Sequence, residues 1–462
     1  MRKIQFCFIV LLIALAASVE AYAVEDPFER ARQSLMAIPK MADPVDPHPQ
    51  DKSSPAPAKP AKTTTPTETE LPAVQPESKK KNDAEELIKI GGRIQIDARR
   101  HQQSATYQDP SSTGMFVSLR RARLDARGEL SPKIKYKTSI EMADKVKAKD
   151  LYIKVKLGGL TYEGGQFSYP LGSENISSSR YYEFVEPSIL SETFSGSRDR
   201  GLLVLGNALD KRLFFSAGVV NGTGDNTPDR NNSMDFVGQA QGLLYEEKER
   251  QLTLWVGGSF ESGIRDSSES ESVEIAPETE SGFALFAADL PNDQAYKRMR
   301  YDVDAKVLFG SATLAGEFLN GVFTYENQAT VRGGYVFASY FLTGEQRTVE
   351  EGLLERQKIK NPVDTANGIG AWEVALRYSW FEVDDNFFTA GGLFDAWEGV
   401  DPEANARRGT AWTLGVNWYP TSKSRVMLNY IKTVAQAFDE EAGAYTTLSN
   451  ESAMLLRLQV EY

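Results

Sequence analysis

The residues of this chain best suited to chemistry are basic side chains gathered between residues 86 and 170. They include Arg93, Arg99, Arg120, Arg121, Arg123, Arg127, Lys133, Lys135, Lys137, Lys154 and Lys156. The segment holds 16 Lys and Arg against 9 Asp and Glu, a balance of +7, whereas residues 171–462 hold 25 against 43, a balance of −18. Guanidinium and ammonium groups bind oxyanions through charge-assisted hydrogen bonds, so the chemistry they indicate is anion binding.

The spacing of these cations would place them on one face of extended strands, because side chains two residues apart share a face. Three groups follow that spacing: Arg121, Arg123 and Arg127; Lys133, Lys135 and Lys137; Lys154 and Lys156. We therefore expect a cationic wall on adjacent strands. The alternative is an ordinary charged lumen, in which nearby carboxylates pair with the cations; these are Asp97, Asp125, Glu129, Glu141 and Asp150.

The chain offers little for catalysis or metal binding. The only cysteine is Cys7, and the only histidine after residue 86 is His101, which we expect in an external loop. A serine hydrolase needs a histidine beside its serine, and a metal site needs several ligands together. We expect no enzymatic activity, no cofactor and no metal, so function should come from the charges themselves.

The elements that position these charges are strands in which apolar and polar residues alternate. Ile88, Ile90, Ile94 and Ile96 alternate with polar neighbours, and the closing strand alternates up to the terminal Tyr462. The same period recurs at 133–142, 151–157, 301–309, 372–380 and 412–418. Lipid-facing and lumen-facing side chains must alternate in this way in an outer-membrane barrel.

The connections alternate in length as well. Short turns are expected at 131–132, 158–159, 310–311 and 420–424, and long polar loops at 172–200, 221–235, 261–297 and 384–408. This asymmetry is typical of outer-membrane barrels. It predicts an all-β, transmembrane antiparallel β-barrel of about sixteen strands over residues 86–462, wide enough for an aqueous channel. Residues 343–369 do not fit, because they form a long connection on the side of the short turns; a miscounted strand near 283–301 or 322–335 is the alternative.

A soluble β-sandwich or β-helix is the competing fold. Its outward face would be polar, whereas aromatic residues here gather near strand ends, as in the girdles of membrane barrels. These residues are Trp372, Tyr378, Trp380, Trp412, Trp418, Tyr419, Tyr430 and Tyr462.

The first 85 residues read as two export-related segments. Residues 1–23 combine Arg2 and Lys3, an apolar run and an Ala21-Tyr22-Ala23 site, which predicts a signal peptide. Residues 24–85 hold ten prolines between Pro39 and Pro76 and predict a disordered periplasmic arm, with 28–38 able to form a short helix.

Several motifs resemble those of the phosphate-selective porin O and P family, in that family's order, across residues 88–462. They are RRARL at 120–124, GQF at 165–167 with Pro170, GSRDRG at 196–201, GVVNG at 218–222, YVFASYFLTGE at 335–345, GAWE at 370–373 and LRLQV at 456–460. The resemblance implies a sixteen-stranded barrel, a homotrimer, and a third loop that narrows each pore while basic side chains guide phosphate or polyphosphate.

Carried over by residue, the resemblance gives Arg120 and Arg121 the role of the tandem arginine near the constriction, and it makes 133–137 a periplasmic lysine cluster. Arg180, Arg198 and Arg200 become candidates for the constriction loop. The chain departs from the family in its acidic later loops; Ser259–Ser281 holds seven carboxylates against Arg265.

The leading hypothesis is therefore a porin of the bacterial outer membrane that passes small anions by diffusion. Its expected partners are inorganic anions, outer-membrane lipid and lipopolysaccharide, two further copies of the chain, and the barrel assembly machinery, which would read the C-terminal strand; no nucleic acid is expected. The alternatives are a structural envelope protein that anchors the outer membrane to the cell wall, and a general, non-selective porin.

Overall fold

The computed structural model describes residues 88–102, 114–191, 196–227, 233–265, 272–290, 295–393, 399–439 and 441–462. The expected signal peptide (1–23), the arm (24–85) and its helix at 28–38 lie outside the described residues, and those three predictions stay untested. In the part of the chain that is described, no helix is long and apolar enough to cross a membrane.

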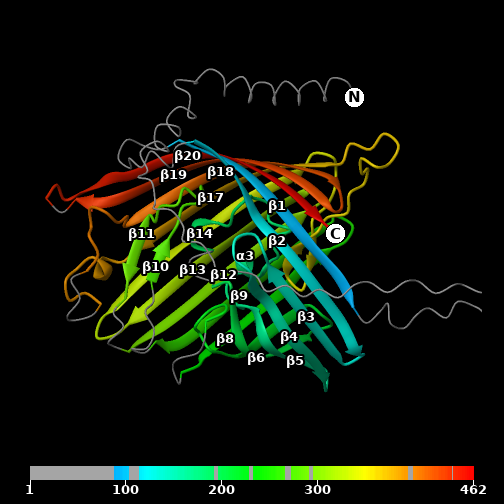
Figure 1. Cartoon of the computed structure of the whole chain (residues 1–462), viewed down its shortest axis with the longest axis horizontal. Coiled ribbons are helices and arrows are strands. Elements are labelled where there is room, and N and C mark those ends of the chain that lie inside the picture. The colour runs from blue at the N-terminus through cyan, green and yellow to red at the C-terminus, as the bar shows by residue number, and fades with distance from the viewer. Residues whose placement is uncertain are drawn as a thin grey trace, which may run out of the picture. The chain divides into compact units, whose positions relative to one another are not determined.

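Sixteen strands of the described residues close into one antiparallel barrel in chain order (Figure 1). The first nine are β1 (Lys89–Gln102), β2 (Gly114–Ser131), β3 (Ile134–Glu141), β4 (Lys147–Leu157), β5 (Leu160–Ser168), β6 (Arg198–Ala208), β7 (Leu213–Val220), β8 (Asp235–Glu247) and β9 (Leu252–Arg265). The other seven are β12 (Tyr296–Phe309), β13 (Ala312–Thr324), β14 (Gln328–Phe341), β17 (Ala371–Val383), β18 (Arg408–Thr421), β19 (Ser424–Asp439) and β20 (Ala444–Glu461). Pairing of β20 with β1 closes the ring, which confirms the predicted barrel of about sixteen strands.

Alternation along each strand explains the barrel. On β1 the side chains of Ile94 and Ile96 are 42% and 40% exposed on the outside, whereas Gln95 and Asp97 between them are fully buried on the inside. Apolar side chains can face lipid without losing hydrogen bonds, while polar ones find partners within the lumen. Outward aromatic residues also pair across strands, as Trp372 and Trp418 do with ring centres 5.7 Å apart.

The seam between the first and last strands is covered by the C-terminal residue. Tyr462 exchanges backbone hydrogen bonds with Gly92 on β1, at 3.2 and 3.3 Å. A Cβ placed on Gly92 would lie 2.4 Å from the Tyr462 hydroxyl and 2.3 Å from the Arg123 carbonyl. Glycine at this position therefore leaves the space that the tyrosine ring occupies.

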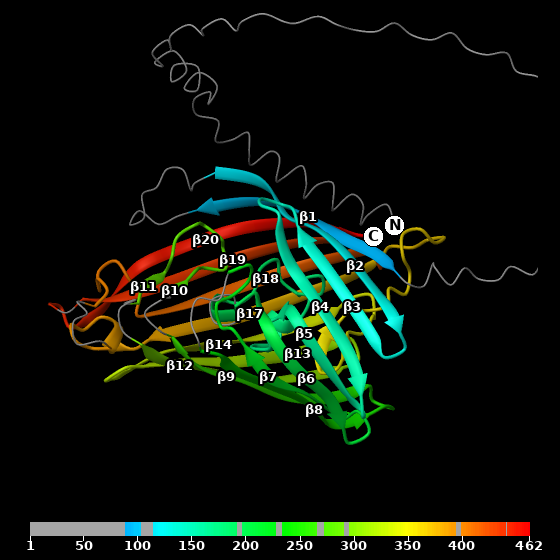
Figure 2. The same cartoon turned by 60° about the horizontal axis from the view of Figure 1, so that its bottom comes forward.

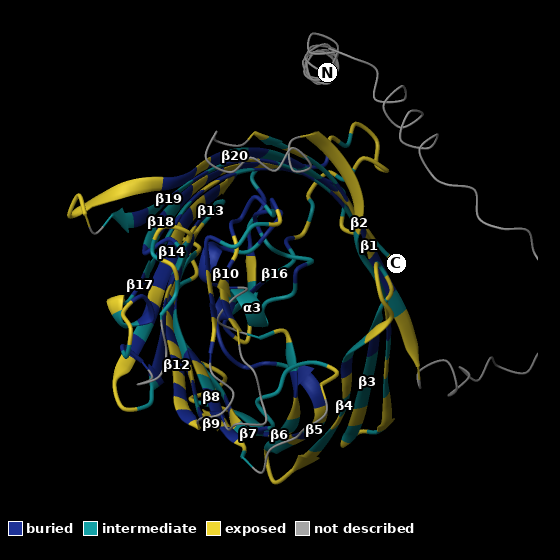
Figure 3. Cartoon of the chain, turned by 60° about the vertical axis from the view of Figure 1, so that its left-hand side comes forward, coloured by how far each residue is buried: buried dark blue, intermediate teal, exposed yellow. Residues whose placement is uncertain are grey.

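Three segments fold inside the ring, as the labels α3, β10 and β16 in Figure 3 show. The inner loop (residues 169–197, described for 169–191 and 196–197) carries α3 (Ser173–Ile176). The hairpin of β10 (Ser272–Ile275) and β11 (Phe286–Asp289) precedes β12, and that of β15 (Thr348–Glu350) and β16 (Leu353–Glu355) precedes β17. A 3-10 turn, η2 (Asp385–Phe387), follows β17.

Residues 342–370, here called the periplasmic segment, connect β14 to β17 on the side of the short turns. The strand count therefore stands, and the connection at 343–369 is itself long. It is long because it enters the lumen, where Arg347 and Leu354 are buried and Leu354 packs with Phe184 of the inner loop.

Candidate functional site

The inner loop crosses the barrel from β5 and is fixed to the opposite wall. The backbone N–H of Val185 donates to Asn429 on β19 at 2.7 Å, and the side chain of Asn417 on β18 donates to the Glu183 carbonyl at 2.8 Å. Near the start of the loop, the N–H of Ser173 donates to Glu317 on β13 at 2.7 Å. These contacts fill the part of the lumen next to β12–β20, here called the closed half.

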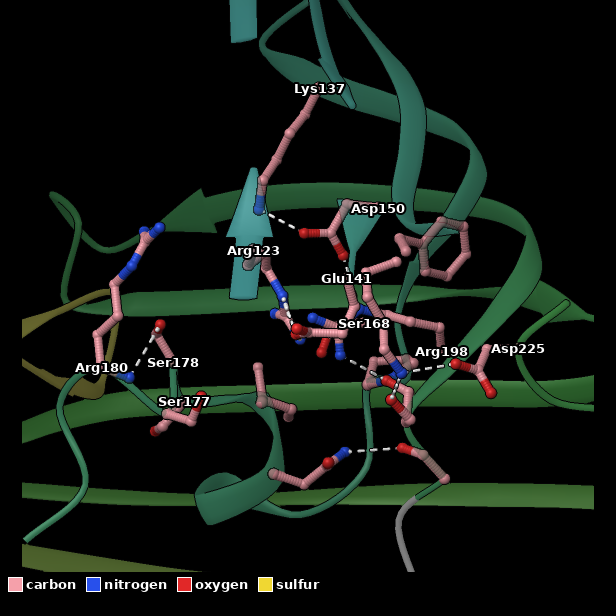
Figure 4. A pocket seen from close by; sticks show the side chains of 18 of the residues that line it. Arg123, Lys137, Glu141, Asp150, Ser168, Ser177, Ser178, Arg180, Arg198 and Asp225 are labelled. Carbon is pink, nitrogen blue, oxygen red and sulfur yellow. Dashed lines mark hydrogen bonds and ion pairs between the residues drawn. The ribbon is translucent and has the colours of Figure 1, made fainter. Parts of the chain in front are cut away.

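The other side of the lumen remains open. A cavity of about 860 Å³, here called the open passage, lies against the first strands of the barrel and the near face of the inner loop (Figure 4). Figure 2 shows those strands, β1 to β4, side by side in blue to cyan. Its basic lining residues are Arg93, Arg120, Arg121, Arg123, Lys137, Lys145, Lys147, Lys149, Lys154, Arg180 and Arg198. Its acidic ones are Asp125, Glu141, Asp144, Asp150, Glu163, Asp225 and Glu351, which leaves four more cations than carboxylates.

A β-bulge turns two consecutive arginines into the lumen. Pairing between β1 and β2 shifts at Gln95, which lies opposite Arg121, while Ile96 lies opposite Leu119. The extra residue is Arg120, so both Arg120 and Arg121 line the open passage. Strict alternation would have sent one of them toward lipid, and a bulge re-aims a side chain in this way.

Arg120 is committed to carboxylates. It donates to Glu186 at 3.0 Å through two nitrogens and to Glu280 at 2.7 Å, both from segments folded into the lumen. Arg99 reaches the same two carboxylates, at 3.4 and 2.5 Å, and Asp97 at 3.0 Å. The carboxylates of this network neutralise the charges of Arg120 and Arg99.

The two loop carboxylates of this network differ in acidity. Burial alone would raise the pKa of Glu186, but Arg457 and Arg120 hold it well below its usual value. Burial and the adjacent charge of Glu186 raise the pKa of Glu280 to about 7, despite Arg120 and Arg99. Glu280 is thus the member that changes charge near neutral pH.

Arg93 and Arg121 have no carboxylate partner among the described residues. Arg93 donates to the Ser178 hydroxyl at 3.3 Å, and Arg121 donates to the Gln95 amide oxygen at 3.0 Å. Both partners are neutral, and within the described residues neither guanidinium group forms an ion pair with a carboxylate. An unpaired charge in a partly desolvated lumen is costly, and an anion lying beside it would offset that cost.

The cations on β2, β3 and β4 are partly paired, as the alternative interpretation of the sequence foresaw. Arg123 pairs with Glu141 at 3.1 Å, Lys135 with Glu129 at 2.7 Å, Lys137 with Asp150 at 2.5 Å and Lys154 with Glu163 at 3.2 Å. Within the described residues, Arg127, Lys133 and Lys156 have no ion-pair partner. Lys133 and Lys156 line a second cavity at the end with short turns.

The three candidates for the constriction loop have different positions. Only Arg180 lies in the inner loop, where it pairs with Asp125 of β2. Arg198 begins β6 and pairs with Asp150 at 2.6 Å at the rim of the open passage (Figure 4). Arg200 also belongs to β6; its exposed side chain contacts Gln166 at 3.4 Å and does not line the open passage.

His101 corrects another expectation, since it lies on β1 and not in a loop. Its ring Nε2 is 2.8 Å from the Thr279 carbonyl oxygen of the segment before β12. Strand β1 extends one residue further, to Gln102, because it pairs with β20 up to Ser452. The ring therefore contributes to packing between the wall and an inward segment.

Two groups of functional side chains escaped the sequence analysis. Lys145, Lys147 and Lys149 line the open passage, and their alternation where β4 begins was the signal that could have found them. Arg347 of the periplasmic segment pairs with Glu183 at 3.0 Å and Glu373 at 2.9 Å. No local pattern announces that contact, since its partners lie in a loop and a strand far away in the chain.

Comparisons with known proteins agree with this architecture. The model of a family described as phosphate-selective porin O and P matches residues 88–462. Porin O of Pseudomonas aeruginosa is 23% identical over 382 residues, which cover 76% of this chain and 83% of that protein. The high-pH structure of OprB from Pseudomonas putida is 12% identical, with a TM-score of 0.50 over 82% of this chain and 95% of that one. An anion-selective porin from Comamonas acidovorans is 11% identical, with a TM-score of 0.48 over 81% and 99% of the two chains.

Proposed function

The chain belongs to the phosphate-selective porin O and P family of outer-membrane porins, and from that premise we propose that phosphate-like anions cross its barrel through the open passage. The observation that carries the proposal is the pair Arg93 and Arg121, which form no ion pair with a carboxylate among the described residues. Charges on a narrow, low-dielectric wall focus the potential in the channel and select ions of the opposite sign.

The path of an anion follows the cations from end to end. Lys145, Lys147 and Lys149 attract it at the outer mouth, and Arg93 and Arg121 receive it beside the inner loop. Below them, unpaired Lys133 and Lys156 face the periplasmic mouth. Because neighbouring cations are partly paired, each step is attractive enough for entry and weak enough for release, as conduction requires.

Reversal potentials across planar bilayers test this proposal. We expect an anion-selective potential, with phosphate competing against chloride, and a marked loss of anion preference for Arg93→Gln and Arg121→Gln. Arg332→Gln is the matched control, since Arg332 is exposed on β14 and pairs with Glu382 away from the passage. A cation-selective potential, or unchanged selectivity in both variants, would overturn the proposed path. A lumen that hardly conducts would favour the structural anchor.

Membership of the family also bears on catalysis, oligomeric state, assembly and contact with lipopolysaccharide. The family indicates a channel and not an enzyme, and we infer that the chain carries no catalytic activity. We also infer a homotrimer, assembly through recognition of the C-terminal strand, and contact of the acidic outer loops with lipopolysaccharide through divalent cations. Crosslinking of the detergent-extracted protein tests the trimer.

A further inference from the structure

The lumen wall near the periplasmic mouth carries apolar side chains where a water-filled channel would be expected to carry polar ones. Leu205 on β6, Phe214 on β7, Leu243 on β8 and Trp255 on β9 all occupy inward-facing positions. Phe214 and Trp255 pack together with ring centres 6.3 Å apart. Leu205 and Phe214 are only half-buried, so each keeps an apolar face toward the lumen.

Leu205 and Phe214 share a cavity with Lys133 and Lys156. The cavity, here called the periplasmic pocket, has a volume of about 350 Å³ and is lined by Leu205, Phe214 and Leu353 of the periplasmic segment. Its basic lining residues are Lys133, Lys135, Lys154 and Lys156, against the single carboxylate Glu351. Strands β3 and β4 therefore give the pocket its cations, while β6, β7 and the periplasmic segment give it apolar side chains, beside the polar Asn207, Ser216 and Gln239.

A wall of this kind discriminates among anions by more than charge. An inorganic anion gains from the lysines but loses hydration beside the apolar side chains. An anion with an apolar body gains from both sides, because removing apolar surface from water contributes about 25 cal/mol per Å². Apolar surroundings with a few fixed polar groups are also the usual composition of small-molecule sites.

Resting on the proposed passage of anions, we propose that the periplasmic pocket is a subsite for organic anions that join a phosphate or carboxylate group to an apolar or aromatic body. Lys133 and Lys156 hold the charged group, while Leu205, Phe214 and Leu353 contact the body. The pocket would thereby extend the permeant class from inorganic phosphate to phosphate esters.

Inhibition of the chloride current in planar bilayers tests the subsite, with inorganic phosphate, methyl phosphate and phenyl phosphate added on the periplasmic side. We expect phenyl phosphate to inhibit by half at a roughly tenfold lower concentration than methyl phosphate, in line with the additional apolar area. Leu205→Asn, Phe214→Gln and Leu353→Asn should each reduce that ratio. Lys133→Gln and Lys156→Gln should weaken both esters and leave the ratio unchanged.

Phe309→Ala is the matched control, because Phe309 is 56% exposed at the same end of the barrel but faces outward on β12. Leu353 lies outside the barrel strands, so its variant tests the pocket even where a strand variant fails to fold. Equal inhibition by the two esters, or a ratio that persists in all three apolar variants, would overturn the subsite. If inorganic phosphate still inhibits the chloride current in that case, the proposed anion path stands and only the subsite is excluded. If the channel shows no anion selectivity, both the path and the subsite are excluded.

Discussion

Arg120 and Arg121 are adjacent on β2 but differ in how much of their positive charge is available to an anion. Arg120 is held by Glu186 and Glu280, whereas Arg121 contacts only a neutral amide. The number of basic residues therefore overstates the attraction of the lumen for anions. What matters at the scale of single residues is which guanidinium groups lack a carboxylate.

Glu280 makes this balance depend on pH. Its pKa is raised to about 7, chiefly by burial, so acidification through neutral pH neutralises it and releases charge on Arg120 and Arg99. We expect anion preference to rise between pH 8 and pH 6, measured by reversal potential, and to rise less in Glu280→Gln. A raised carboxyl pKa also means that the folded state binds more protons than the unfolded one, so stability should fall as pH rises from about 4.5 to 7. A pH response of Glu280→Gln as large as that of the unaltered chain would contradict this role.

Several of these residue positions follow from sequence, and others do not. Alternation is sufficient to place Arg93, Arg123 and Lys137 on the inner face, since the period of a strand is two. It cannot place Arg120, because a bulge breaks the period without a change in composition. Arg200 was grouped with the inner loop because nothing in GSRDRG marks the residue at which β6 begins. The ion pairs of Arg120 also lie beyond such reasoning, because they depend on how far separated loops meet.

Among the elements, the periplasmic segment acts as a brace for the inner loop. Arg347 joins Glu183 of that loop to Glu373 of β17 and donates to Gln357 at 3.1 Å, all within a buried cluster. We expect Arg347→Met to leave two buried carboxylates unpaired and to destabilise the fold by about 3–5 kcal/mol. Thermal unfolding followed by circular dichroism measures the loss, and single-channel recordings should show a noisier current. Arg212→Met is the control, since Arg212 lies in an exposed turn and contacts only backbone carbonyls. If Arg347→Met and Arg212→Met lower the stability equally, the periplasmic segment does not brace the inner loop.

The seam between β1 and β20 gives a second prediction for the elements. In Gly92→Ala the added methyl group would meet the Tyr462 ring and the Arg123 carbonyl, so the terminal residue must move away. The contact that closes the barrel between β1 and β20 should weaken. In gel electrophoresis of heated samples, the folded form should therefore disappear at a lower temperature. Gly164→Ala is the control, because its methyl group would meet only the tip of Leu202, at 3.0 Å. The sequence indicated a closing strand but not this contact, which depends on a pairing between the two ends of the barrel.

For the barrel as a whole, the acidic balance of residues 171–462 does not produce an acidic passage. Asp235 pairs with Arg265 at 2.5 Å and Glu261 with Arg298 at 2.8 Å, and all four side chains are buried. These carboxylates of β8 and β9 are thus neutralised by buried arginines, and the +7 segment faces the open passage. The summed charge predicted asymmetry correctly, but the side that each charge faces required the folded barrel.

Selectivity that depends on this summed field should weaken with salt. The Debye length falls from about 10 Å at 0.1 M to about 3 Å at 1 M ionic strength, so cations on the wall lose influence over the centre of the passage. We expect the anion-to-cation permeability ratio from reversal potentials to decline over that range. A ratio independent of salt would instead indicate selection by direct contact at a single site.

The division of the lumen into an open and a closed half has a consequence for how such a barrel changes over time or by design. Side chains on β13, β17, β18 and β19 support rigidity, because inward segments pack on them and none of them lines the open passage. Those on β1–β7 line the passage proposed for the solute, and some of their ion pairs join neighbouring strands, as Arg123–Glu141 and Lys154–Glu163 do. Solute choice can therefore drift, or be engineered, along one contiguous stretch of chain while the remainder acts as an inherited frame.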